Sequence, residues 1–251
     1  MNTLLELRGL EKRYANGTLA LQDMSLTVGE HEIVSFLGPS GCGKSTALKM
    51  IAGLAQPTGG QMLWPGRTDA GRGGDISFVF QEPTLMPWAT VFDNVWLPLR
   101  LKGLARSVAQ PAVDAALAAV GLTEFARVYP RELSGGMKMR VSIARAMITQ
   151  PRLLLMDEPF AALDEITRSR LNNDTLMVWQ ANRFTAIFVT HSVYESVYLS
   201  QRIVVMGARP GRVVAEIAID EPYPRGSAFR STERYNRWCV EVSTALQREA
   251  E

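Results

Sequence analysis

The sequence predicts an α/β fold with a largely parallel sheet that helices cover on both faces. An apolar run over residues 32–37 leads through a glycine-rich turn directly into a helical pattern over 44–54. Further short apolar runs are rich in β-forming residues, and helical patterns lie between several of them. These runs cover residues 76–80, 153–156, 186–190 and 202–206. Strands and helices that alternate in this way are typical of an α/β domain.

The first thirty residues have the pattern of a β-hairpin. Strand-like runs at 4–7 and 24–28 are separated by the turn-forming sequence Ala15-Asn16-Gly17. Between 91 and 150 the composition changes to Ala- and Leu-rich segments with helical spacing. The clearest helical patterns lie at 108–120 and 136–147. We therefore expect a helical lobe inserted into the sheet domain.

The carboxyl-terminal segment begins at Asp220 with a breaker, Pro222-Tyr223-Pro224, and ends in an expected amphipathic helix. The apolar face of that helix would carry Tyr235, Trp238, Val242 and Leu246. We divide the chain into four segments: 1–90 and 151–219 form the sheet core, 91–150 the helical lobe, and 220–251 the tail.

Composition excludes several classes of protein. The 251 residues carry 27 Lys+Arg and 25 Asp+Glu, and a net charge of +2 gives little support to a nucleic-acid binder. Residues 100–150 are locally +5, which favours a solvated helix face over a functional patch. Cys42 and Cys239 are far apart and no secretory leader is expected, so a reduced, cytosolic protein fits best. The longest charge-free stretch, 50–66, is broken by prolines and glycines and is too short to span a membrane.

One nine-residue run matches the phosphate-binding pattern G-x-x-x-x-G-K-[ST]: Gly38-Pro39-Ser40-Gly41-Cys42-Gly43-Lys44-Ser45-Thr46. Glycines let backbone N–H groups surround a phosphate, and the following helix directs its positive end at the same anion. Lys44 would bridge the β- and γ-phosphates, and the Ser45 hydroxyl would bind Mg²⁺. We expect Cys42 to fill space, because a reactive thiol needs exposure and a lowered pKa.

Two carboxylates, Asp157 and Glu158, follow the apolar run 153–156. Ligands of open α/β sheets bind at the carboxyl ends of strands. Asp157 is placed to hold the Mg²⁺ shell and Glu158 to polarise an attacking water. The pair alone is moderate evidence, but together with the phosphate loop it indicates an ATPase.

A further peptide, Leu133-Ser134-Gly135-Gly136-Met137, resembles the signature peptide of ATP-binding cassette (ABC) ATPases. Other elements of that family follow in the expected order: Tyr14, Gln81, Ala162-Leu163-Asp164 and His191. Met137 and Ala162 depart from the commonest Gln and Ser of the family. The resemblance implies a P-loop NTPase fold: a mixed sheet core, an antiparallel β subdomain and an inserted helical subdomain.

The resemblance also implies a role for each of these residues. Tyr14 would stack on adenine, Gln81 would contact the metal and water, and His191 would hold the γ-phosphate. Ser134, Gly135, Gly136 and Asp164 would meet the nucleotide of an opposite protomer. ATP and Mg²⁺ are then the cofactors, and two cassettes, expected as a homodimer, share two sites.

The segment from Glu82 to Val95 resembles ATPase subunits of nitrate, sulfonate and taurine importers. We expect Leu85, Met86 and Trp88 to be exposed and to dock a membrane subunit's coupling helix; the alternative is local packing of the helical lobe. The stretches 160–164 and 209–225 resemble the same subfamily less specifically.

The sequence thus predicts the ATP-hydrolysing subunit of an importer, peripheral at the cytoplasmic face of the inner membrane. Separate permease subunits and an extracytoplasmic solute-binding protein would select the solute, and nitrate, alkylsulfonates, taurine and pyrimidine-like precursors all remain open. We expect no nucleic-acid partner. One alternative is a soluble ABC ATPase acting on DNA or ribosomes, although only 53 residues separate Gln81 from Ser134. Another is a nucleotide-binding module without turnover.

Overall fold

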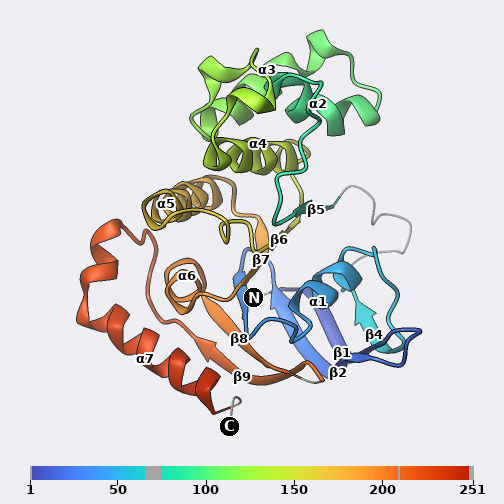
Figure 1. Cartoon of the computed structure of the whole chain (residues 1–251), viewed down its shortest axis with the longest axis vertical. Helices are drawn as coiled ribbons and strands as arrows, with labels where there is room; N and C mark the ends of the chain where they lie inside the picture. Colours follow the sequence, from blue (N-terminus) through green and yellow to red (C-terminus); the bar gives the residue numbers. More distant parts are fainter. Residues whose placement is uncertain (1, 66–74, 209, 249–251) are drawn as a thin grey trace. The chain divides into compact units, whose positions relative to one another are not determined.

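The computed structural model describes residues 2–65, 75–208 and 210–248. The chain forms two compact units (Figure 1). Unit 1 consists of residues 1–71 and 185–251, and unit 2 of residues 72–184. The segment boundaries predicted at 90, 150 and 219 stay a prediction. Arg209, the first residue of the stretch 209–225 noted above, lies outside the described residues.

Unit 1 contains a three-stranded antiparallel sheet with the strand order β2-β1-β4. Strands β1 (Thr3–Arg13) and β2 (Leu19–Gly29) form the predicted hairpin, which is confirmed and is longer than the sequence runs suggested. Burial alternates along residues 24–28 of β2, as expected for a sheet with one face on a core, whereas β1 buries Leu4, Leu5, Leu7 and Leu10. The third strand, β4 (Gly59–Leu63), was not predicted.

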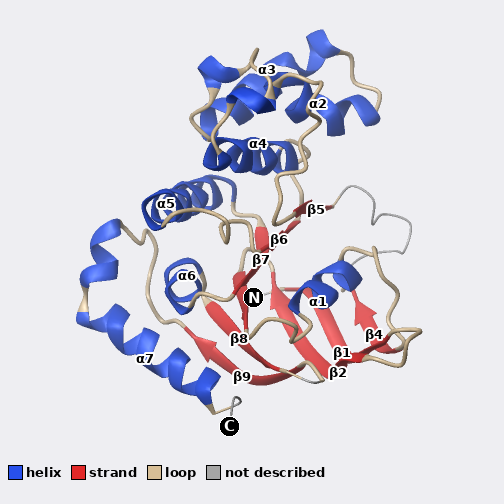
Figure 2. Ribbon diagram, viewed as in Figure 1, coloured by secondary structure: helices blue, strands red, loops and turns tan. Residues whose placement is uncertain are grey.

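The second sheet of unit 1 is mixed, with the order β7-β3-β8-β9 (Figure 2). Strands β7 (Thr185–Thr190), β3 (Ile33–Leu37) and β8 (Arg202–Gly207) are parallel and almost entirely buried, which explains their continuous apolar sequences. Strand β9 (Arg212–Ala218) runs antiparallel to β8. Two helices follow strands of this sheet: α1 (Lys44–Ile51) and α6 (Val193–Leu199).

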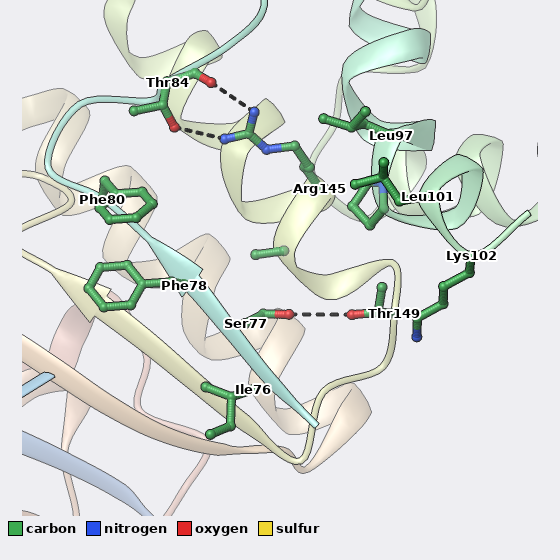
Figure 3. A pocket seen from close by; sticks show the side chains of 12 residues that line it. Ile76, Ser77, Phe78, Phe80, Thr84, Leu97, Leu101, Lys102, Arg145 and Thr149 are labelled. Carbon is green, nitrogen blue, oxygen red and sulfur yellow. Dashed lines mark hydrogen bonds between the residues drawn. The ribbon is translucent and has the colours of Figure 1, made fainter. Parts of the chain in front are cut away.

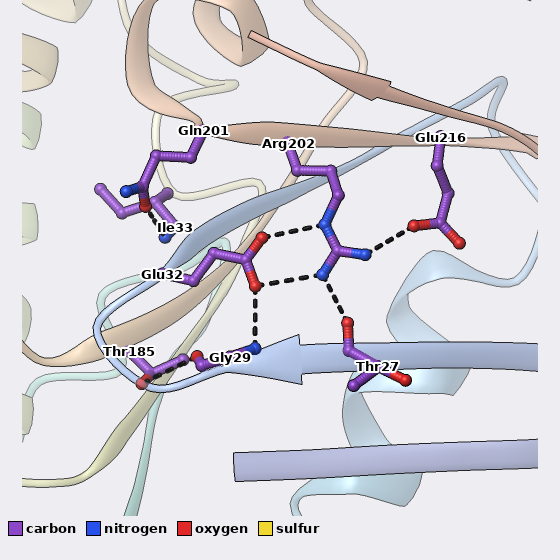
Figure 4. Close-up of polar contacts among 8 residues, drawn as sticks. All are labelled: Thr27, Gly29, Glu32, Ile33, Thr185, Gln201, Arg202 and Glu216. Carbon is purple, nitrogen blue, oxygen red and sulfur yellow. Dashed lines mark hydrogen bonds and ion pairs between the residues drawn. The ribbon is translucent and has the colours of Figure 1, made fainter. Parts of the chain in front are cut away.

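A closed polar network lies at the amino end of β3 (Figure 4). Glu32 is buried, and its carboxylate accepts from the Arg202 guanidinium at 2.9 and 3.1 Å and from the backbone N–H of Gly29 at 2.8 Å. Arg202 also donates to Glu216 at 2.6 Å and to the Thr27 carbonyl. The network thereby joins β2, β8 and β9 around the start of β3.

Unit 2 combines a pair of parallel strands with four α-helices. The strands are β5 (Ile76–Val79) and β6 (Leu153–Asp157). The helices are α2 (Val91–Leu101), α3 (Arg106–Ala119), α4 (Gly135–Met147) and α5 (Glu165–Asn182), with short 3-10 turns at Thr123–Phe125 and Pro130–Glu132. The helices expected at 108–120 and 136–147 are confirmed. An apolar core that includes Val95, Leu117 and Val141 holds α2, α3 and α4 together.

The tail contains a 3-10 turn at Ser227–Ser231 and helix α7 (Glu233–Gln247). Tyr235, Cys239 and Val242 are buried on one face of α7, so the predicted amphipathic helix is confirmed. Cys239 was not predicted to belong to that face. Among the described residues, no helix is both long and apolar enough to cross a membrane.

Candidate nucleotide site

The predicted phosphate loop lies between β3 and α1. Gly43, at the amino end of α1, has a φ of 90°, and no side chain caps the helix there. The first N–H groups of a helix have no partner within the helix, and together with the helix dipole they favour an anion. The loop and helix start therefore have the geometry of a phosphate site.

Lys44 places a positive charge inside this loop. Its side chain is buried, with 4% of its surface exposed, and the ammonium donates to the carbonyl oxygens of Gly38 at 2.7 Å and Pro39 at 3.0 Å. Two carbonyl oxygens of the loop thus hold the charge inside the loop. A lysine ammonium at a glycine-rich loop is a charged partner of the kind that a triphosphate requires.

Residues of β2, β8 and the segment before β9 pack closely against the phosphate loop. A Cβ on Gly38 would lie 2.5 Å from the Met206 carbonyl oxygen, and one on Gly43 would lie 2.8 Å from the Ala20 carbonyl oxygen. A Cβ on Gly211, just before β9, would overlap the Cys42 carbonyl oxygen. Cys42 itself is fully buried, and burial raises the pKa of its thiol. Cys42 therefore has neither the exposure nor the lowered pKa of a reactive thiol, as expected.

Strand register brings His191 to the same sheet edge as the loop. Leu37, the last residue of β3, pairs with Thr190, the last residue of β7, so the loop and His191 begin at neighbouring strand ends. His191 is exposed. Tyr14 also lies at the loop, because its hydroxyl is 3.3 Å from the Thr46 hydroxyl, and its ring is 43% exposed. Unit 1 thus brings Tyr14, the phosphate loop and His191 together.

Unit 2 gathers the predicted carboxylates and Gln81 at one strand edge. Val79 of β5 pairs with Met156 of β6, so Gln81 and the pair Asp157 and Glu158 follow neighbouring parallel strands. Glu158 has a φ of 47°, a left-handed conformation that is uncommon for a residue other than glycine. Backbone strain of this kind is concentrated at functional sites.

The signature peptide starts helix α4 of unit 2. Ser134 and Gly135 are exposed, and the Ser134 hydroxyl accepts from the Met137 N–H at 3.3 Å as the helix cap. Gly136 is buried, and a Cβ there would lie 2.8 Å from a Thr167 methyl group. The close packing of α5 therefore explains the glycine at this position. Met137 packs against the helical core, which gives the apolar side chain at this position a structural role.

Asp164 caps helix α5. The backbone N–H of Thr167 donates to its carboxylate at 3.0 Å, and this bond lowers the pKa of Asp164. The side chain is exposed, so it is available to a second molecule while it also begins its own helix. The exposed Ser134, Gly135 and Asp164 are thus all at helix starts of unit 2.

The predicted Mg²⁺ ligands fit that ion in their chemistry. Ser45, Gln81 and Asp157 offer a hydroxyl, an amide and a carboxylate oxygen, and Mg²⁺ prefers oxygen ligands completed by water and phosphate. Within the described residues, no group of three or more His, Cys, Asp or Glu side chains could hold a metal by itself. Each of the three side chains thus offers an oxygen of the kind that Mg²⁺ takes together with water and phosphate.

The expectation for the segment after Gln81 is only partly right. Trp88 is 77% exposed, but Leu85 and Met86 are half-buried, and Leu85 packs against the helical core. Asn94, which was not predicted, explains the shape of the segment: it is fully buried and exchanges hydrogen bonds with the backbone of Met86 at 2.8 and 3.2 Å. Packing against the helical core therefore accounts for Leu85, and the Asn94 hydrogen bonds hold the backbone of Met86.

A pocket of about 620 Å³ lies next to this segment in unit 2 (Figure 3). Phe78 and Phe80 of the β5 region stack with ring centroids 4.3 Å apart on one side, and Leu97 and Leu101 of α2 line the other. Arg145 of α4, at the rim, donates to the carbonyls of Pro83 and Thr84, both at 2.9 Å. This contact was not predicted, because nothing in the sequence indicates a bond over sixty residues.

The chain is similar in sequence to several known proteins. Residues 21–161 match the family model described as ABC transporter. The aliphatic sulfonates import ATP-binding protein SsuB of Bacillus licheniformis is 45% identical, over 88% of this chain and 87% of its own length. The taurine import protein TauB of Rhizobium johnstonii is 44% identical (83% and 79%), and the nitrate import protein NrtD of Synechocystis is 38% identical (97% and 95%).

Two solved structures share the fold. One is cbiO1 of Clostridium perfringens, part of the ABC transporter complex cbiONQ, with a TM-score of 0.81 and 26% identity over 97% of this chain and 100% of that chain. The other is a dimeric ATP-binding cassette bound to ADP and inorganic phosphate, with a TM-score of 0.76 and 31% identity over 87% and 100%. The predicted fold class and family resemblance are confirmed, and the chain belongs to the ABC transporter family.

Proposed function

We propose that this chain is the ATP-binding and ATP-hydrolysing subunit of an importer that energises the uptake of a small solute through separate membrane subunits. The observation that carries the proposal is the buried Lys44 inside a glycine loop, at the sheet edge shared with His191. The import functions printed for SsuB, TauB and NrtD support the direction of transport and suggest a sulfonate, taurine or nitrate-like solute.

In this proposal the phosphate loop, Lys44 and the start of α1 bind the triphosphate, and the Tyr14 ring stacks on adenine. Ser45, Gln81 and Asp157 would hold Mg²⁺, which neutralises charge that develops on the phosphates. Glu158 accepts a proton from the attacking water, and His191 orients the γ-phosphate. The left-handed backbone of Glu158 supports its assignment as the base.

We propose further that two copies of the chain share each site. Ser134 and Gly135 expose the start of α4, and Asp164 exposes the start of α5, which leaves these groups accessible to a nucleotide on a second copy. The dimeric relative with ADP and phosphate supports this arrangement. ATP would draw the two copies together, and hydrolysis would separate them.

The membrane partner would dock on unit 2. The pocket between the β5 region and α2 has aromatic and leucine walls, and Trp88 lies exposed on the segment that leads into α2. A short helix from a permease subunit fits such a pocket. The chain would then be peripheral at the cytoplasmic face of the membrane, and an extracytoplasmic binding protein would deliver the solute to the permease.

The decisive experiment uses Glu158→Gln. Removal of the base should lower ATP turnover by about 100-fold or more while ATP binding persists, so the variant should elute as a dimer in size-exclusion chromatography with ATP and Mg²⁺. The exposed Glu124→Gln serves as the control and should behave as the wild type. Unchanged turnover would refute the role of Glu158, and a variant that stays monomeric with ATP would refute the shared site.

A further inference from the structure

His191 lies at the junction between strand β7 and helix α6. His191 directly follows β7, and the next residue, Ser192, caps α6 by accepting from the Glu195 N–H at 3.3 Å. Thr190 reinforces this junction, because its hydroxyl accepts from the Ser192 N–H at 3.0 Å and donates to the buried Glu195 carboxylate at 2.5 Å. Only one residue thus links the strand to the cap, and a shift of α6 moves His191.

The helix has only seven residues, too few to be stable alone. The tail lies beside it, because helix α7, red in Figure 1, packs against α6. The Tyr235 hydroxyl of α7 donates to the Tyr194 carbonyl at 2.9 Å, near the start of α6. The Tyr223 hydroxyl donates to the Leu199 carbonyl at 2.6 Å, at the end of α6.

Arg225 makes the largest set of these contacts. Its guanidinium is 5% exposed and donates to carbonyls of the last turn of α6 and beyond, those of Val197 at 3.0 Å, Tyr198 at 3.2 Å and Ser200 at 2.7 Å. The Tyr198 hydroxyl donates back to the Arg225 carbonyl at 2.8 Å. A cation at the carboxyl end of a helix is favourable, because the last carbonyls have no partner in the helix and carry the negative end of the dipole.

The same guanidinium reaches the chain that follows β9. It donates to the carbonyls of Ile219 at 3.3 Å and Glu221 at 2.8 Å, and it lies over the Tyr223 ring at 4.3 Å from the centroid. Arg225 therefore connects the end of α6 to the end of the mixed sheet. Only a planar group with five N–H donors can serve so many carbonyls, and a lysine ammonium has three.

We propose that Arg225 is a positioning residue for ATP hydrolysis, which acts through α6 to hold His191 at the edge of the sheet. The carboxyl-terminal tail then belongs to the catalytic apparatus and is more than a surface appendage. This inference rests on the proposed role of His191. We expect nucleotide binding and turnover to respond differently to Arg225, because its contacts are to α6 and to the chain after β9, whereas the close approaches to the phosphate loop come from β2, β8 and Gly211.

The test measures steady-state hydrolysis by the full chain with Mg²⁺ and ATP. Tyr223→Phe removes one hydroxyl donor, keeps the ring under Arg225 and should lower kcat roughly fivefold. Arg225→Lys should lower kcat by about tenfold or more, because the ammonium replaces only part of the hydrogen bonds. In both variants KM for ATP should stay within about twofold of the wild type. Rates are divided by the concentration of ATP-binding sites from titration, so unfolded protein does not contribute.

The exposed Arg237→Lys on α7 is the matched control and should keep the wild-type kcat. Variants at Tyr223 and Arg225 with wild-type kcat per binding site would overturn the inference, as would a loss that appears only in the number of binding sites. Failure of the proposed function has a different signature: the wild-type chain itself would then not hydrolyse ATP, or Glu158→Gln would be fully active.

Discussion

The two ends of strand β3 are built in opposite ways. At the amino end, Glu32 and Arg202 satisfy each other and the neighbouring backbone in a closed network of side chains. At the carboxyl end, Gly43 leaves the start of α1 without a side-chain cap, and Lys44 is held by loop carbonyls. One end is closed within the protein, whereas the other is arranged for a ligand.

The five residues of β3 thus separate a region that contributes to folding stability from a region that would bind the nucleotide. A buried ion pair costs much when one partner is lost, because the other charge remains buried. A phosphate loop has the reverse property, since its backbone groups gain their best partner only when the anion binds. Changes at the amino end should therefore affect unfolding, and changes at the carboxyl end should affect nucleotide affinity.

The largest effect is expected for Lys44→Ala. The triphosphate loses a charged hydrogen-bonding partner and the loop loses the ammonium that holds it, so ATP affinity should fall by about 100-fold or more. Isothermal titration with Mg²⁺ and ATP measures this change. Lys49→Ala, an exposed lysine on the same helix, is the control. Unchanged ATP affinity in Lys44→Ala would contradict the assignment of the carboxyl end of β3 to nucleotide binding.

At the amino end, Arg202→Met should destabilise the fold without weakening ATP binding. It leaves the buried Glu32 carboxylate without its charged partner, and the free energy of unfolding should fall by about 3 kcal/mol. Urea unfolding measures the loss. The exposed Arg8, paired with Glu6, offers a contrast, because Arg8→Met should change the urea midpoint little. The comparison fails if folded Arg202→Met binds ATP much more weakly than the wild type.

The smallest effect concerns alkaline pH and the tail. Burial raises the pKa of Cys239 to about 11. Its ordinary value is about 9, so the unfolded chain loses this proton first, and stability that is complete below pH ~9 decreases as the pH rises toward 11. Between pH ~7.5 and ~9.5 the change from this thiol should be about 1 kcal/mol. Cys239→Ala should unfold with a weaker dependence on alkaline pH, and an unchanged dependence would contradict the assignment.

Much of the nucleotide site could be predicted because its residues are contiguous. The loop around Lys44 joins a strand to a helix, and both periodicities are visible in the surrounding sequence. His191 itself was named only through the family resemblance, and the strand register of the folded chain places it at the edge shared with the loop. The roles given to these residues stay predictions until they are measured.

Other features depend on contacts between distant residues. The sequence does not reveal that Glu32 meets Arg202, because 170 residues separate them. Strand β9 was missed because it is mostly half-buried, lacks the continuous apolar run of the core strands and is defined by its antiparallel partner β8. Arg225 looked like one more arginine in a proline-rich loop, and only the folded chain shows that it is buried among carbonyl groups. Leu85 was expected at the surface because local sequence does not show which helical face will cover it.

The close approach of Gly211 to Cys42 gives the loop a remote support. Gly211 accepts from the Gln22 N–H and donates to the Ala20 carbonyl, so it is fixed to β2 while it lies against the loop backbone. A methyl group at this position would act as a wedge beneath the phosphate loop. A substitution at Gly211 would therefore displace the phosphate loop from a position outside the nine-residue motif.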